Sequence, residues 1–168
     1  MRSERGYTLF EILIVIGLIG IVSAISVPVF IESNARSSLW SGAEQIGSTI
    51  RSARLKAISQ NTNYRIVFNC PSANEVRALI VTGDAGIDDP ADLATRCGDT
   101  YEGDSGTIEL PTGVAYDADD ALFLEVTGRG IFTASGGPIP LTITVTHGAA
   151  TRTLTVSGTG QVTFTDVD

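Results

Sequence analysis

The chain of 168 residues is poor in the side chains from which many catalytic and metal sites are built. It contains one histidine, His147, and two cysteines, Cys70 and Cys97. Three such residues fall short of the roughly four ligands of a structural zinc site, so a Cys/His zinc framework is excluded. His147 lies in an expected hairpin turn and is interpreted as a solvated loop residue. No Ser/His/Asp nucleophile set is inferred from it, and no catalytic residue is assigned.

Basic residues are also scarce and unevenly distributed. Lys56 is the one lysine, and the formal net charge is -8. Beyond residue 60 the sequence has 15 acidic residues against five arginines, namely Arg65, Arg77, Arg96, Arg129 and Arg152. Because phosphate binding requires clustered Lys and Arg, this composition argues against a nucleic-acid-binding or anionic-membrane-binding surface on the C-terminal part.

Charge is absent altogether from a long run near the N-terminus. The twenty residues from Ile12 to Ile31 carry no charged side chain, and as a helix they span roughly 30 Å, the thickness of a bilayer core. The run therefore predicts a membrane-spanning helix. A cleaved signal peptide is the alternative, since Arg2 and Arg5 form a basic segment and Val22-Ser23-Ala24 resembles a cleavage site. The length of the run and the acidic Glu11 beside it count against that alternative.

The charges that flank the span predict its orientation. Arg2 and Arg5 precede it, which favours an N-terminus in the cytoplasm and export of the rest of the chain. In an oxidising compartment Cys70 and Cys97 are expected to form a disulfide, with two unpaired thiols as the alternative.

Glu11 requires an explanation, because an acid near the membrane interior costs on the order of 3 kcal/mol. Placement at the membrane interface is one explanation. Another comes from its neighbours, since the stretch Arg5-Gly6-Tyr7-Thr8-Leu9-Phe10-Glu11 resembles the processing site of type IV prepilins and type II secretion pseudopilins. The resemblance implies that a membrane peptidase cuts after Gly6 and methylates the new amino terminus at Tyr7.

The same resemblance implies an assembly role for Glu11, which becomes the fifth residue of the mature chain. Its carboxylate can be neutralised by the new ammonium of Tyr7, within one helix or between stacked subunits. The family pattern assigns this pairing to a neighbouring subunit, although Tyr7 stands where the family usually has Phe or Met. Pro28 matches the family and predicts a helix kink, because it removes one backbone hydrogen bond and crowds the carbonyl of Ala24.

Residues 32–60 predict an amphipathic continuation of the same helix. Apolar residues recur there at alternating steps of four and three, and Trp40 and Ile58 widen the stripe that they form. Asn61-Thr62-Asn63 is expected to end the helix. The stripe consists of Leu39, Ala43, Ile46, Ile50, Ala53 and Ala57.

From residue 64 onward the pattern changes to the period of two that is typical of strands. We expect an α+β fold in which the helix covers one face of an antiparallel sheet. Hairpin connections are expected at His147–Ala150 and Ser157–Gly160. The acidic segment Thr82–Gly106 has no periodicity and is expected to be an exposed interaction loop or to be stapled locally. The candidate strands are 64–69, 75–81, 107–110, 122–127, 141–146, 151–157 and 161–165.

Two further stretches narrow the resemblance to the GspH/FimT group of minor pseudopilins and minor pilins. They are Ile50–Ile58 followed by Tyr64–Phe68, and Arg152–Ser157 followed by Gly158, Gly160, Gln161 and Val162. The implied layout is a leader at 1–6, a transmembrane half-helix at 7–31, an amphipathic half-helix at 32–60 and a periplasmic β-rich domain at 61–168.

The resemblance implies a structural subunit and not an enzyme. The first hypothesis is a minor pseudopilin of a type II secretion system, anchored in the inner membrane and assembled into the periplasmic pseudopilus tip. The alternatives are a FimT/FimU-like minor pilin of a type IV pilus, including the DNA-uptake kind, and a membrane-anchored enzyme. The implied partners are other pseudopilins or pilins, the prepilin peptidase/methyltransferase and the inner membrane. No cofactor and no nucleic acid are expected.

Two groups of acidic residues could supply oxygen ligands to calcium. Neither has the alternating acids, central glycine and terminal glutamate of an EF-hand loop. We therefore expect solvated loop acids and assign no metal site. The groups are Asp84, Asp88, Asp89 and Asp92, and Asp117, Asp119 and Asp120.

Overall fold

A single long helix, α1 (Leu9–Gln60), organises the structure, which is a computed structural model that describes residues 7–117, 122–135 and 139–167. The hydroxyl of Thr8 caps its first turn by accepting a hydrogen bond from the backbone N–H of Glu11 at 3.2 Å. The helix ends at Gln60 and is capped by Asn61, whose left-handed backbone conformation (φ 51°) is typical of a helix C-terminus.

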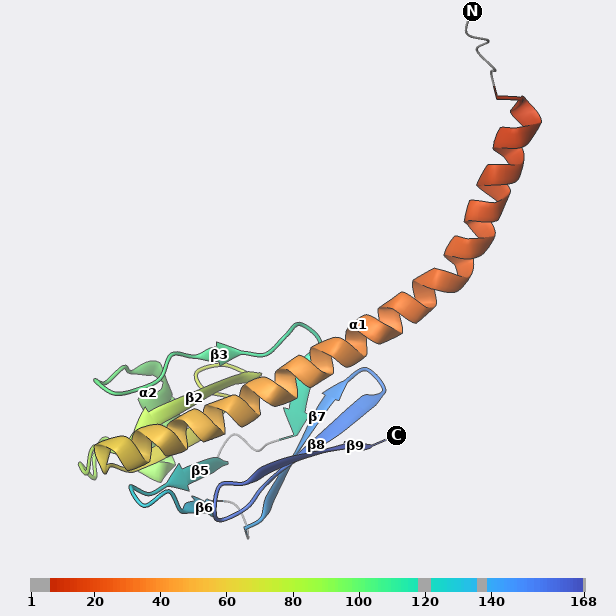
Figure 1. Cartoon of the computed structure of the whole chain (residues 1–168). Coiled ribbons are helices and arrows are strands. Elements are labelled where there is room, and N and C mark those ends of the chain that lie inside the picture. Colours follow the sequence, from red (N-terminus) through yellow and green to blue (C-terminus); the bar gives the residue numbers. More distant parts are fainter. Residues whose placement is uncertain (1–6, 118–121, 136–138, 168) are drawn as a thin grey trace, which may run out of the picture.

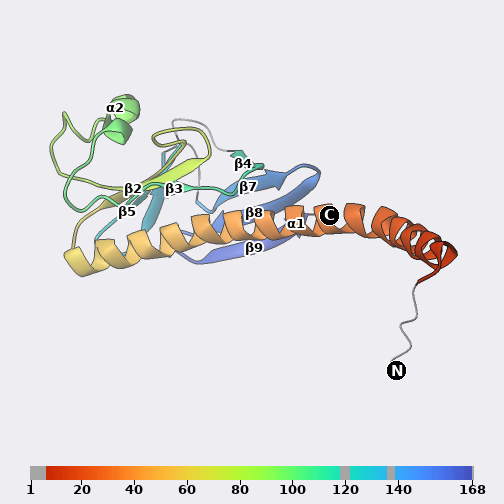
Figure 2. The ribbon, with the colours of Figure 1, turned by 90° about the horizontal axis from the view of Figure 1, so that it is seen from above.

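The two halves of α1 have different surroundings. Its N-terminal half extends beyond the sheets and curves away from them, whereas the C-terminal half lies along them (Figures 1 and 2). Pro28 lies inside the curved half. The kink expected at Pro28 itself stays a prediction. The first buried residue of α1 is Leu39, so the sheets cover the helix only from there onward.

The predicted apolar stripe is confirmed as the face of α1 that packs on the sheets. All six residues from Leu39 to Ala57 that form it are buried. Trp40 and Ile58 do not extend the buried face in full, because each is about half-exposed at its margin. Gly42, Gly47 and Thr49 are buried beside the stripe instead.

The strands form two antiparallel sheets, not the one sheet expected from the sequence. The five-stranded sheet has the order β3-β2-β1-β5-β6 and the four-stranded sheet the order β4-β7-β8-β9. One helix face cannot cover a sheet of nine neighbouring strands, and the division lets each twisted sheet pack on α1. Their bounds are β1 Tyr64–Phe68, β2 Glu75–Ile80, β3 Ile108–Glu109, β4 Val114–Asp117, β5 Phe123–Val126, β6 Phe132–Ala134, β7 Leu141–His147, β8 Ala150–Val156 and β9 Val162–Val167.

The core lies between α1 and the two sheets. In β1, alternate residues Tyr64, Ile66 and Phe68 point into this core, where Ile46 and Ile50 of α1 also lie. Val67 belongs instead to a second, smaller cluster that contains Leu79, Leu93, Phe123 and the two cysteines. The α+β fold expected from the sequence is confirmed.

Two local expectations, on the strands and on His147, are corrected by the structure, and the acidic segment is found to contain secondary structure. The strands β4 and β6 lie where no strand was expected, and each is a short strand at the edge of its sheet. The acidic segment contains a 3-10 turn at Pro90–Asp92 and a short helix, α2 (Leu93–Gly98). His147 is the last residue of β7, paired with Val114 of β4, so the connecting turn is shorter than expected.

Candidate assembly site

The N-terminal half of α1 exposes a continuous apolar surface. Every residue from Leu9 to Asn34 is exposed, including its many Ile, Leu, Val and Phe side chains. Among the described residues this is the one helix long and apolar enough to cross a membrane. Large exposed apolar patches mark contact with lipid or with other proteins, so this half of the helix is the candidate assembly surface.

Glu11 and Tyr7 lie at the free end of this surface. Tyr7 is 80% exposed and precedes the helix, and Glu11 is in the first helical turn. A carboxylate is favourable at this position because of the helix dipole. Within the part of the chain that the structure describes, Glu11 has no ion-pair partner. The predicted cleavage residue Gly6 lies outside the described residues, so the structure locates the processing motif only from Tyr7 to Glu11.

The disulfide between Cys70 and Cys97 is present and confirms that prediction. It joins the end of the β1 strand region to α2, with a Cα–Cα distance of 5.3 Å. Because α2 lies in the acidic segment, the bond staples that segment to the five-stranded sheet. Of the two expectations for residues 82–106, local stapling is therefore the one observed.

A buried ion-pair network holds the same segment from its other end. Both carboxylate oxygens of Asp104 accept hydrogen bonds from Arg96, at 2.7 and 2.8 Å, and these two side chains are 1% and 4% exposed. Arg77 lies 3.5 Å from the same carboxylate and donates to the carbonyls of Cys97 and Asp99. The network thus ties α2 and its following turn to β2. Sequence reasoning missed it, because its members are isolated charges far apart in the chain.

The environment of Asp104 sets its protonation. Burial opposes ionisation, but hydrogen bonds from Arg96 and from the backbone N–H groups of Tyr101 and Ile80 outweigh it. The pKa of Asp104 therefore lies below its ordinary value, and hydrogen bonding to Asp104 raises the pKa of Arg96. Burial, followed by the nearby charge of Asp104, raises the pKa of the Tyr64 hydroxyl.

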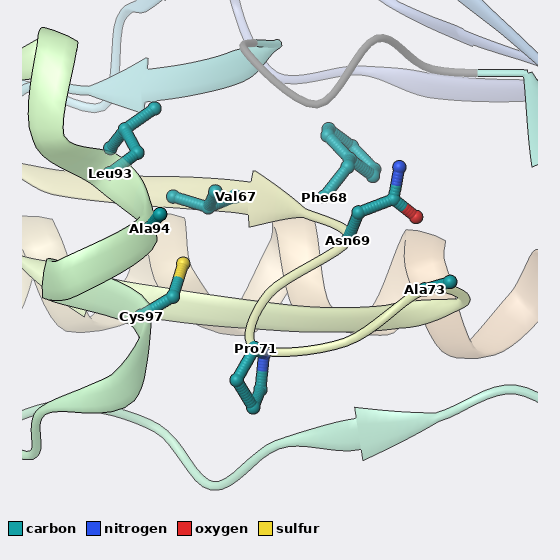
Figure 3. A pocket seen from close by; sticks show the side chains of 8 residues that line it. All are labelled: Val67, Phe68, Asn69, Pro71, Ala73, Leu93, Ala94 and Cys97. Atoms are coloured by element: carbon teal, nitrogen blue, oxygen red, sulfur yellow. The ribbon is translucent and has the colours of Figure 1, made fainter.

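A pocket of about 360 Å³ lies beside the disulfide, between α2 and the β1–β2 turn. Figure 3 shows Leu93 and Ala94 of α2 at one side of it and Pro71 and Ala73 of the turn at the other. Its lining has no ionisable side chain. The pocket therefore lacks the acid, base or nucleophile that a catalytic centre would require.

The acidic residues of the first calcium candidate group mostly bind backbone. Asp88 accepts hydrogen bonds from Thr82 and Gly83, and Asp84 accepts one from the N–H of Gly86. Asp89 caps the 3-10 turn. In the described part of the chain no group of three or more His, Cys, Asp and Glu could hold a metal ion. Asp119 and Asp120 of the second group lie outside the described residues.

Four of the five arginines beyond residue 60 contact carboxylates. Arg65 pairs with Glu125 at 2.9 Å, and Arg77 and Arg96 contact Asp104. Arg152 is 5% exposed, lies 3.0 Å from a carboxylate oxygen of Asp166 and stacks on Trp40. Their positive charge is therefore balanced locally and does not form an exposed basic patch.

His147 is more than the solvated loop residue expected from the sequence. It is half-buried, and its Nε2 side faces Gly113, where an added Cβ atom would lie 2.7 Å from Nε2. Gly113 also has a φ of +83°, which favours glycine. The pairing of β4 with β7 thus brings the histidine against the turn before β4, an effect that no local pattern could reveal.

A long, unpartnered apolar helix whose second half packs on a small antiparallel β domain defines a pilin-like, membrane-anchored structural subunit. The chain belongs to the GspH family, because the model of that family, described as type II transport protein GspH, matches residues 42–160. The prokaryotic N-terminal methylation motif matches residues 1–27. Proteins of the pilin and pseudopilin family are structural subunits and not enzymes, and this chain is one of them.

Individual proteins show the same relationship. The pilin-like protein PilA1 of Thermus thermophilus is 26% identical over 159 residues, which cover 95% of this chain and 97% of PilA1. A fimbrial protein of Pseudomonas aeruginosa is 33% identical over 58 residues, 34% of this chain and 37% of that protein. The crystal structure of the type IV minor pilin FimU of Pseudomonas aeruginosa has a similar fold, with a TM-score of 0.54 and 15% identity over 77% of this chain and 90% of FimU.

Proposed function

We propose that this chain is a minor pseudopilin of a type II secretion system and assembles into the periplasmic pseudopilus tip. The observation that carries the proposal is the exposed apolar half of α1 joined to a GspH-type domain. Such a helix is stable in lipid or against other apolar helices, but not in water. A subunit of this kind can be held in the membrane by its apolar helix before assembly, and can then pack into a filament through the same surface.

The proposal includes a topology for each part of the chain. Residues 1–6 are the leader on the cytoplasmic side, 7–31 span the inner membrane, 32–60 continue the helix and 61–168 form the periplasmic domain. The prepilin peptidase/methyltransferase cuts after Gly6 and methylates Tyr7. Glu11 then pairs with the ammonium of a neighbouring subunit, and Pro28 bends the helix.

A minor pilin of a type IV pilus is the second candidate. The similarity to PilA1 along nearly the whole chain and the fold shared with FimU favour it. Both candidates use the same helix and the same processing motif. They differ in the proteins that surround the subunit.

Site-specific crosslinking in native membranes tests the two candidates. A photoreactive residue in place of Ile14, which is exposed, should capture the subunits that pack on α1. The same residue in place of Ile46, which is buried against the sheets, is the matched control and should capture no other protein. Captured pseudopilins, with a secretion defect on gene deletion, would support the first candidate. Captured pilins, with loss of pili, would support the second, and an Ile14 variant that captures neither would contradict both.

A further inference from the structure

A groove of about 790 Å³ lies where α1 leaves the sheets. Figures 1 and 2 show the tip of the β7–β8 hairpin next to this part of the helix. One wall of the groove is formed by Ile31, Ala35 and Leu39 of α1, and the other by Gly148, Ala149 and Ala150 of the hairpin. The lining is thus largely apolar and made of small side chains at the hairpin tip.

The groove also has charged groups of both signs. Glu32 and Arg36 on α1 form an ion pair at 2.9 Å in which both side chains are more than two-thirds exposed. Asp166 of β9 lies in the lining and is half-exposed. Because exposed ion pairs contribute little, Glu32 and Arg36 can exchange their contact for a ligand at low cost.

The position of the groove along α1 fixes what surrounds it in a membrane. If residues 12–31 cross the hydrocarbon core, Ile31 lies at its boundary. The headgroup layer beyond it is about 5 to 8 Å thick, which corresponds to about four or five helical residues. Glu32, Ala35 and Arg36 then lie at the level of the lipid headgroups.

From this placement we propose that the groove binds the headgroup of an aminophospholipid, one that carries a phosphate and a primary ammonium. The inference rests on the proposed membrane placement of residues 7–31. The ammonium donates hydrogen bonds to the carboxylates of Glu32 and Asp166, and Arg36 binds the phosphate. Ile31, at the boundary of the hydrocarbon core, contacts the first part of the lipid chains.

The charges favour this ligand over other lipids. Glu32 pairs with Arg36, and Asp166 lies 3.0 Å from Arg152, so these four side chains carry no net charge. Such a balanced set suits a zwitterionic headgroup better than one with net negative charge. A choline headgroup has a quaternary ammonium with no N–H group, so it cannot donate to either carboxylate. A lipid with a phosphate and a primary ammonium can bind Arg36 through the phosphate and the two carboxylates through the ammonium.

The α1 helix of a second copy is the rival occupant. Its uncharged segment would remove water from the Glu32–Arg36 and Asp166–Arg152 ion pairs without replacing the lost hydrogen bonds, and such desolvation is costly. The lipid is therefore the better match for the groove.

Native mass spectrometry of the full chain tests the proposal. The chain is reconstituted at low protein density in vesicles that contain equal parts of phosphatidylethanolamine and phosphatidylcholine, then released in mild detergent. We expect phosphatidylethanolamine to be retained over phosphatidylcholine by about tenfold, the effect of one charge-assisted hydrogen bond in a partly desolvated site. Trp40, the one tryptophan, lines the groove and should emit at shorter wavelength in phosphatidylethanolamine than in phosphatidylcholine vesicles.

Two variants and one control decide the outcome. Glu32→Gln should remove most of the lipid preference, and Ala35→Phe should fill the groove and remove retention. Glu44→Gln is the matched control, since Glu44 is an exposed acid that contacts Arg51 on the same helix outside the groove. Equal retention of both lipids, an unchanged Glu32→Gln variant, or a second copy retained in place of lipid would overturn the proposal. Flotation of the vesicles distinguishes failure of the headgroup proposal from failure of the membrane placement of residues 7–31. A chain that does not float with the vesicles contradicts the membrane placement itself.

Discussion

Asp104 accepts two hydrogen bonds from Arg96, and this pair joins the acidic segment to the sheet at a site almost closed to water. A buried pair of this kind does not by itself add much stability, because both charges are desolvated. Removal of one partner is strongly destabilising, since the other charge is left buried and uncompensated. The pair therefore fixes the conformation of residues 82–106 relative to the sheet.

Asp104→Asn should lower the free energy of unfolding by about 3 to 5 kcal/mol, the usual effect of leaving a buried charge unpaired. Urea unfolding of the full chain in detergent, followed by Trp40 fluorescence, measures this change. Asp99→Asn is the control, because the side chain of Asp99 is exposed and only its backbone carbonyl contacts Arg77. Equal midpoints for the two variants would contradict the role of the pair.

The stability of the domain should also depend on pH through Asp104. Its pKa in the folded state is lowered below the unfolded value of about 3.9. The resulting stabilisation is fully present above the unfolded pKa and is lost as the pH falls through the folded pKa. Urea midpoints measured from pH 7 down to pH 2 should fall at the acid end. Asp104→Asn should show a smaller acid decrease than Asp99→Asn, and parallel curves would refute the assignment.

The disulfide should contribute to stability independently of the ion pair. Cys70 and Cys97 are 27 residues apart, and closure of such a loop contributes roughly 3 to 4 kcal/mol in the chain-entropy model. The double variant Cys70→Ser/Cys97→Ser should lose about that amount in urea unfolding. Alkylation of unreduced, denatured protein gives the direct check, because a bonded pair takes up no reagent and two labelled thiols would disprove the bond.

The stripe on α1 and the disulfide could be predicted from the sequence, because each depends on a local or simple rule. Apolar steps of four and three place Leu39, Ile46 and Ala57 on one helix face whatever they contact. The division into two sheets could not be predicted, since a period of two identifies the buried face of a strand and not its neighbours. The strands β4 and β6 were also missed, because each is a short edge strand defined by its hydrogen bonds to one neighbour, β7 or β5, and not by an apolar pattern of its own.

The missed residues of the site act through contacts between distant parts of the chain. Gly47 reads as an ordinary helical glycine, yet a Cβ atom there would lie 2.8 Å from the ring of Phe164 in β9. The sequence shows only separated charges at Arg77, Arg96 and Asp104, and the fold brings them together. The groove beside Trp40 likewise exists only because β7 and β8 place their connecting turn against α1. The close approach at Gly47, the ion-pair network and the groove all depend on how the strands and the helix are arranged in space, which no local sequence pattern reveals.

The processing motif predicts cleavage after Gly6. Replacement of Gly6 by a bulkier residue, as in Gly6→Leu, should leave the precursor uncut, because the family's peptidase cuts after glycine. Mass spectrometry of protein from native membranes should find a chain that begins with methylated Tyr7. Gly20→Ala, at an open position inside the helix, should be processed normally. A mature chain that starts near Ser26 would establish a signal peptide instead.

Glu11→Ala should leave membrane insertion intact and impair entry into filaments. Removal of the acid eases insertion into lipid, whereas the proposed partner ammonium of a neighbouring subunit loses its counter-charge. Co-purification with the other pilins or pseudopilins measures assembly, and carbonate extraction measures insertion. Glu44→Ala, on the exposed face of the same helix, is the control. Normal co-purification of Glu11→Ala would contradict the proposed pairing.

The domain should not bind DNA appreciably at physiological salt. Affinity for DNA arises largely from the neutralisation of phosphates by clustered cations. Arg129 is exposed, but Arg152 is buried against the rings of Trp40 and Phe164 and contacts Asp166. Fifteen acidic residues beyond residue 60 add repulsion.

A gel-shift titration of the full chain in detergent with duplex DNA at about 0.15 M salt tests this expectation, which bears directly on the choice between secretion and DNA uptake. No shift is expected at micromolar protein. A salt-sensitive shift that Arg129→Ala abolishes, and that the control Arg51→Ala on the helix leaves unchanged, would reveal a usable cation cluster around Arg129. That result would contradict the charge balance argued from Arg65, Arg77, Arg96 and Arg152, and it would favour a pilus subunit that captures DNA.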